Sequence, residues 1–127
     1  TIRILDIGCG SGHGTFMLSD ILNSQITAID PCEYAIEYAK KHYAAENIHY
    51  EVASGEQFLE NAPPFDYIVS RHALEHFEDG LNFALKYRCY KRLMVNVPFN
   101  ESAGNIYHKV HWIMENSFEN YMNKTFF

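Results

Sequence analysis

Positive charge and cysteine are both scarce in this sequence. Ten lysines and arginines stand against 16 aspartates and glutamates, for a formal net charge of −6. A broad binding surface for a polyanion needs an excess of positive charge, so nucleic acid is not an expected partner. The cysteines, Cys9, Cys32 and Cys89, are odd in number and form no Cys-x-x-Cys pair, which argues against a disulfide framework and a cysteine zinc site. Reduced thiols of this kind predict a cytoplasmic protein.

Long apolar runs are absent as well. No run approaches the roughly 18 residues that span a bilayer, and no secretory leader precedes the first apolar segment, so no membrane association is expected. A chain of 127 residues with 47% hydrophobic and 20% charged residues is typical of one globular domain.

Glycine, by contrast, is concentrated near the start of the chain. A short apolar strand pattern at residues 4–7 leads into a turn in which Gly8, Gly10 and Gly12 occupy every second position. Glycine adopts positive φ at little cost and lets a bound cofactor approach the main chain closely. The dinucleotide fingerprint needs a third glycine at a position that is His13 or Thr15 here, so the spacing disfavours NAD. An ordinary glycine-rich turn between strand and helix is the alternative.

A second acidic residue follows the next strand pattern. Residues 25–29 are a short apolar run that ends at Asp30. In an open α/β sheet the carboxyl ends of neighbouring strands face one crevice, where an acid can bind both ribose hydroxyls of a nucleoside. Asp30 is therefore a candidate ribose ligand; a helix N-cap is the alternative.

Strand and helix patterns alternate along the chain. Further strand patterns at residues 48–53, 65–69 and 93–97 bring the expected strands to five. Helical spacing joins three apolar sets, namely Met17, Leu18, Ile21 and Leu22; Cys32, Ala35, Ile36, Ala39 and Tyr43; and Leu81, Ala84 and Leu85. This alternation predicts an α/β fold with a doubly wound parallel sheet.

Asp6 stands two residues before Gly8, and the motif Asp6-x-Gly8-x-Gly10-x-Gly12 resembles the first motif of class I S-adenosylmethionine-dependent methyltransferases. The resemblance implies a Rossmann-like sheet of strand order 3-2-1-4-5, with residues 1–127 forming a single S-adenosyl-L-methionine-binding methyltransferase domain. It also implies that the domain is incomplete at both ends and that the family's final antiparallel hairpin is missing. The fifth strand would then be an exposed edge that pairs with a second copy or is covered by missing sequence.

The resemblance also assigns candidate cofactor residues. Asp6 would brace the glycine turn and face the amino group of the cofactor. Ser54 stands where relatives carry an acid that accepts from the adenine amino group, and Ser54 and Glu56 are candidates for this contact; an ordinary turn residue and a solvated helix-start charge are the alternatives. Arg71 and His72 follow the fourth strand and are candidates for the pocket around the methionine portion.

The expected reaction is transfer of a methyl group to a small-molecule or glycan acceptor. An acceptor hydroxyl must lose its proton, and histidine, with an ordinary pKa near 6.5, is the natural general base. His72 and His76 are the candidates, although a merely structural turn at Glu75 and His76 is an equal alternative. A binding module without catalysis is another possibility, and a nicotinamide oxidoreductase is disfavoured.

A metal-dependent alternative also exists. His72, Glu75, His76 and His108 resemble the ligand set of small-RNA 2′-O-methyltransferases that bind a divalent ion. His72 replaces the first glutamate of that motif, and the negative net charge is unfavourable for RNA. We therefore expect no metal site.

Overall fold

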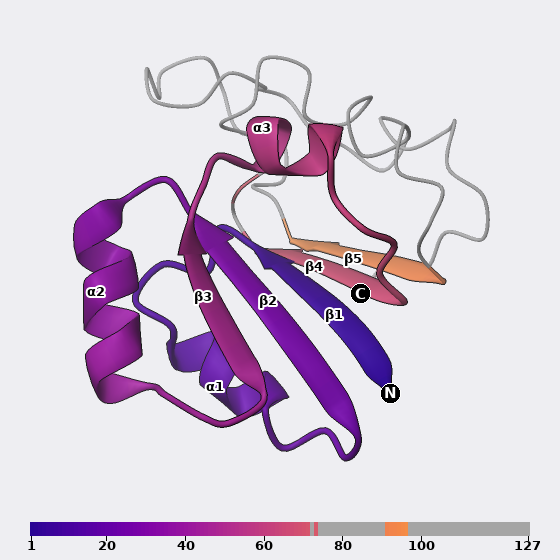
Figure 1. Cartoon of the computed structure of the whole chain (residues 1–127), viewed down its shortest axis with the longest axis horizontal. Coiled ribbons are helices and arrows are strands. Elements are labelled where there is room, and N and C mark those ends of the chain that lie inside the picture. Colours follow the sequence, from indigo (N-terminus) through magenta and orange to yellow (C-terminus); the bar gives the residue numbers. More distant parts are fainter. Residues whose placement is uncertain (72, 74–90, 97–127) are drawn as a thin grey trace.

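The computed structural model describes residues 1–71, 73 and 91–96, drawn in colour in Figure 1. This part of the chain contains five strands and three helices in nearly strict alternation. In chain order they are β1 (Ile2–Ile7), α1 (His13–Leu18), β2 (Ser24–Asp30), α2 (Glu33–His42), β3 (Ile48–Val52), α3 (Gly55–Glu60), β4 (Tyr67–Arg71) and β5 (Arg92–Asn96).

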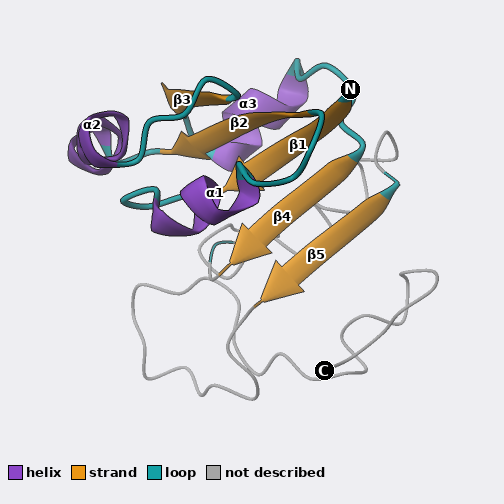
Figure 2. Cartoon of the chain, turned by 90° about the horizontal axis from the view of Figure 1, so that it is seen from below, coloured by secondary structure: helices purple, strands orange, loops and turns teal. Residues whose placement is uncertain are grey.

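The strands form one parallel sheet of order β3-β2-β1-β4-β5, which confirms the predicted fold class and strand order. β1 lies between β2 and β4, and Asp6 pairs with Ala28 on one side and Val69 on the other. Because the strands are parallel, their carboxyl ends meet at one edge of the sheet, as the arrowheads of β4 and β5 indicate in Figure 2. Asp30 and Arg71 end β2 and β4 at that edge.

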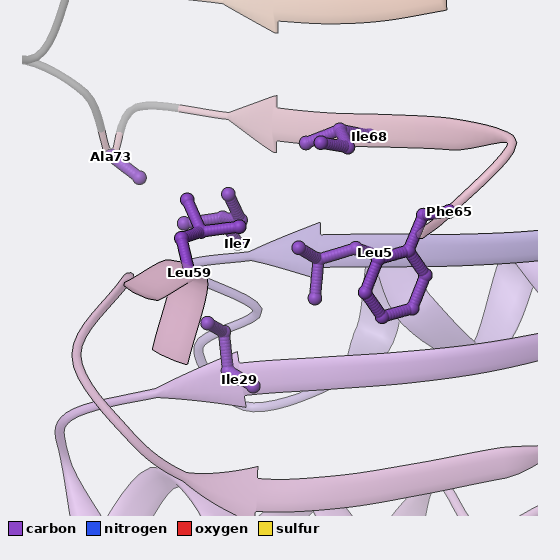
Figure 3. Close-up of a cluster of buried hydrophobic side chains, with 7 residues drawn as sticks. All are labelled: Leu5, Ile7, Ile29, Leu59, Phe65, Ile68 and Ala73. Atoms are coloured by element: carbon purple, nitrogen blue, oxygen red, sulfur yellow. The ribbon is translucent and has the colours of Figure 1, made fainter. Parts of the chain in front are cut away.

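Both faces of the sheet are covered, as expected for parallel strands. On one face, the buried cluster in Figure 3 joins side chains of β1, β2 and β4 to Leu59 of α3 and to Phe65. On the other face, Ile36 and Ala39 of α2 pack with Ala28 and Tyr50. α1 and α2 thus lie on the face opposite α3, which Figure 1 shows. This arrangement leaves the turn between β1 and α1 at the carboxyl edge of the sheet.

The first helix is shorter than its apolar spacing predicts. α1 ends at Leu18, and Ile21 and Leu22 lie beyond it with exposed side chains. Met17 is exposed as well, so Leu18 is the one member of that apolar set that packs against the core. At the end of the helix, the amide and the hydroxyl of Ser19 both donate to the Phe16 carbonyl, at 3.1 and 2.6 Å. The prediction of a four-residue core stripe was therefore wrong.

The boundaries of the other elements lie closer to the predicted ones. The fourth strand begins at Tyr67, just after Asp66, whose amide donates to the Arg3 carbonyl at 2.8 Å and whose side chain accepts the Arg3 amide at 2.9 Å. Cys32, predicted on the buried stripe of α2, is instead the exposed N-cap residue. The predicted helix at Leu81, Ala84 and Leu85 lies outside the described residues. Within the described part, no helix has the length and apolarity needed to cross a membrane.

Candidate functional site

The glycine turn between β1 and α1 has a backbone that favours glycine at each alternate position. Gly8, Gly10 and Gly12 have φ values of 74°, 56° and 92°. The turn is fixed to the neighbouring strand, because the amides of Gly8 and Cys9 both donate to the Ile29 carbonyl, at 2.8 and 3.0 Å. The left-handed conformations explain why the sequence needs glycine here.

The three glycines differ in what surrounds them. A Cβ on Gly8 would lie 2.6 Å from the Cβ of Ala73, and one on Gly12 would lie 2.6 Å from the Cβ of Ala39. A Cβ on Gly10 would meet nothing within 4 Å. Sequence reasoning gave all three glycines the same task of admitting a cofactor. The structure shows that two of them also permit close packing of the turn, whereas open space lies beside Gly10.

Asp30 lies beside this open space, at the end of β2. Its Oδ2 accepts the Gly10 amide at 3.0 Å, and its Oδ1 accepts the Cys32 amide at 2.9 Å. The N-cap residue of α2 is Cys32, so Asp30 is not itself the cap. A carboxylate oxygen has two lone pairs, so each oxygen can accept one further hydrogen bond. Two backbone amides thus hold the carboxylate in place, and it is still able to receive two hydroxyl groups.

Asp6 lies beneath the turn, with no exposed surface. Its Oδ2 accepts the Thr15 hydroxyl at 2.7 Å and Nη2 of Arg71 at 3.0 Å, whereas Oδ1 has no partner among the described residues. Burial raises the pKa of Asp6 above its ordinary value, and the contacts with Thr15 and Arg71 oppose that rise. The carboxylate braces the turn from below, by linking β1 to α1 and β4.

Arg71 ends β4 and reaches over Asp6 toward α1. A Cβ on Gly14 would overlap its guanidinium group, so the arginine occupies space that glycine alone leaves at this position. Sequence reasoning singled out Arg71 but missed Gly14 and Thr15. The continued alternation of glycine to position 14 was the signal for the first; the sequence carries no comparable signal for Thr15.

Ser54 and Glu56 lie at the start of α3. Ser54 is the N-cap residue, and its hydroxyl accepts the Gln57 amide at 3.2 Å. Glu56 is exposed in the first turn of the helix. These are the placements of the two structural alternatives, a turn residue and a solvated charge at a helix start.

The histidine candidates His72 and His76 lie outside the described residues, as do Glu75 and His108. In the part of the chain that the structure describes, no group of three or more histidine, cysteine, aspartate or glutamate side chains is placed to hold a metal ion.

Comparison with known proteins identifies the family. Residues 4–93 match the family model described as a methyltransferase domain. The chain belongs to this family. Its match confirms the resemblance that the Asp6 and glycine motif predicted.

Curated relatives of the methyltransferase domain include enzymes with different acceptors. The chain is 38% identical over 88 residues to a ubiquinone biosynthesis O-methyltransferase of Caulobacter sp. (strain K31). This match covers 65% of this chain and 33% of that protein. It is 31% identical over 103 residues to a ribosomal RNA small subunit methyltransferase C of Haemophilus influenzae (strain PittGG). That match covers 80% of this chain and 30% of that protein. The chain thus spans about a third of the length of these relatives.

Solved structures share the fold. The plantazolicin methyltransferase BpumL in complex with SAH superimposes with a TM-score of 0.72 at 21% identity, over 94% of this chain and 53% of that one. A second structure of BpumL, in complex with a pentazolic desmethylPZN analog and SAH, matches at 27% identity with a TM-score of 0.59, over 68% of this chain and 34% of that one.

Proposed function

We propose that residues 1–127 bind S-adenosyl-L-methionine and transfer its methyl group to a small-molecule or glycan acceptor. The observation that carries this proposal is the pairing of open space at Gly10 with the Asp30 carboxylate, which two backbone amides fix at the carboxyl edge of the sheet. Ligands of open α/β sheets bind at this edge, beside the strand where the order reverses, which is β1 in this sheet.

The described residues fit such a cofactor. The remaining lone pairs on Asp30 suit the two ribose hydroxyls, and the absence of a Cβ at Gly10 lets the ligand approach the turn. Bound S-adenosylmethionine supplies a methyl group that its sulfonium makes electrophilic. The chain's own task is then to orient an acceptor, and His72 and His76 are our candidates for the general base.

The relatives support the same assignment. BpumL, which shares the fold, is crystallised with SAH, and the Caulobacter relative is named for O-methylation in ubiquinone biosynthesis. A small-molecule acceptor is consistent with the net charge of −6, which is unfavourable for an RNA substrate such as the name of the Haemophilus relative indicates. We propose a cytoplasmic location, because three widely spaced cysteines without a Cys-x-x-Cys pair are typical of reduced thiols.

Isothermal titration with SAH, with S-adenosylmethionine and with NAD tests the proposal. We expect both sulfur nucleosides to bind and NAD not to bind. A labelled methyl donor, incubated with phenolic and sugar acceptors, then tests transfer. Binding without transfer to any acceptor would favour a module without catalysis, whereas binding of NAD alone would refute the proposal.

Asp30→Ala tests the ribose contact. The variant loses hydrogen bonds that involve a charged group, which contribute about 1.5 to 3 kcal/mol, so SAH affinity should fall by about 10- to 150-fold. Asp30→Asn is the companion variant, because its amide oxygen can still accept one backbone amide and thus supports the turn. Asp20→Ala removes an exposed acid from the turn after α1 and serves as the charge control. Unchanged SAH affinity in both Asp30 variants would contradict the assignment.

A further inference from the structure

Arg71 is placed differently from the other cations of the described residues. It lies at the carboxyl end of β4, beside the glycine turn, and 43% of its side chain is exposed. Among the other described cations, Arg3, Lys91 and Arg92 lie at the amino ends of strands. Lys40 and Lys41 lie in the last turn of α2. Among the described residues, Arg71 is therefore the cation that a ligand in the turn would meet.

The guanidinium of Arg71 lies between Asp6 and α1. Asp6, which is fully buried, accepts from Nη2 at 3.0 Å, and Gly14 leaves the space that the group occupies on α1. Among the described residues this is its one hydrogen bond, whereas a guanidinium has five N–H donors. The guanidinium is planar, so its remaining donors form a fork that matches the two oxygens of a carboxylate.

The strand order gives the direction of a bound ligand. Asp30 on β2 and Arg71 on β4 flank the turn that follows β1, so a nucleoside with its ribose at Asp30 extends across the turn toward Arg71. The part of S-adenosylmethionine beyond its ribose is an amino acid, which carries a carboxylate. A cation anchored by a buried acid at this place is complementary to that group.

We propose that Arg71 binds the carboxylate of the cofactor's amino-acid half, with Asp6 and Gly14 as the residues that position its guanidinium. The inference rests on the proposed function and deepens it. Arg71 is thereby a binding residue that distinguishes the complete cofactor from the nucleoside alone.

Two ligands separate this contact from the rest of the site. SAH contains the amino-acid half, and 5′-methylthioadenosine has the same nucleoside and sulfur without it. In Arg71→Met, titration should show SAH affinity lower by about 10- to 150-fold, the range for hydrogen bonds between charged groups, and methylthioadenosine affinity within about twofold of the original.

Gly14→Ala keeps every charge and moves the guanidinium. Its new methyl group overlaps the flexible end of an exposed arginine, and alanine is favourable in a helix, so the variant is expected to fold even where Arg71→Met does not. It should show the same selective loss of SAH affinity. Arg92→Met, which removes one exposed cation at the amino end of β5, is the control and should leave both affinities unchanged.

The results separate the inference from the function on which it rests. Equal losses for both ligands in the folded Arg71 and Gly14 variants, or no loss in either variant, overturn the contact. An original chain that binds SAH no better than methylthioadenosine also overturns it, while the proposed cofactor site stands. An original chain that binds neither ligand refutes the proposed function and this inference with it.

Discussion

Thr15→Val removes one hydroxyl from beneath the glycine turn and leaves a side chain of nearly the same shape. Thr15 is fully buried in α1, and its hydroxyl donates to Oδ2 of Asp6 at 2.7 Å. The valine leaves this carboxylate oxygen with Arg71 as its one partner among the described residues. A hydrogen bond to a charged group contributes about 1.5 to 3 kcal/mol, so the free energy of unfolding should fall by that amount.

The size of this loss should depend on pH. Burial raises the pKa of Asp6 above its unfolded value near 3.8, so this residue stabilises the fold most in acid, and that contribution is lost as pH rises through the folded pKa. The Thr15 hydroxyl opposes the rise because it stabilises the charged carboxylate. The valine variant should therefore have a still higher Asp6 pKa, and its deficit should grow from acid toward alkaline pH.

Urea unfolding of both proteins at about pH 4 and about pH 8 measures the effect. Thr27→Val, on a half-buried position of β2, is a matched control for removing a threonine hydroxyl. A deficit below about 0.5 kcal/mol at both pH values, or one that is larger in acid, would refute the account of Asp6 as a buried carboxylate held by this donor.

Two further outcomes follow from the same region. Gly12→Ala should lower the free energy of unfolding by about 2 to 5 kcal/mol, because the new Cβ combines a φ of 92° with a distance of 2.6 Å to the Cβ of Ala39. Gly10→Ala places its Cβ in open space, so urea unfolding should show a loss of only about 1 to 2 kcal/mol, while SAH binding weakens. Equal free energies of unfolding for the two variants would contradict this difference between Gly10 and Gly12. Alkylation of the folded chain at about pH 8 should label exposed Cys32 and spare Cys9, because burial raises the pKa of the Cys9 thiol to about 12. Mass spectrometry of the peptides checks this, and labelling of Cys9 as fast as that of Cys32 would contradict it.

The sequence predicted the sheet well because parallel strands buried on both faces are short apolar runs with clear limits. The alternation of these runs with helical spacing was sufficient for the fold class, and the Asp6 and glycine motif supplied the strand order through the family. The first helix was predicted less well, since Met17 and Ile21 fit an apolar stripe, whereas the helix ends at Leu18 and both side chains are exposed. Apolar spacing alone therefore did not give the end of this helix.

The site was predictable in its residues and less so in their tasks. Asp6, Asp30 and Arg71 were all singled out, but nothing in the sequence indicates that Arg71 pairs with Asp6, because the two are brought together only by the β1–β4 register. In the same way, the packing needs of Gly8 and Gly12 depend on Ala73 and Ala39, which are distant in sequence. Contacts between residues so distant in sequence can be identified only from the folded structure.

A crystal structure of the protein grown with SAH would show where the cofactor binds. We expect SAH along the turn beside Gly10, with both ribose hydroxyls within hydrogen-bond distance of the Asp30 carboxylate. SAH bound elsewhere on the protein, with no contact to Asp30 or to the glycine turn, would contradict this placement.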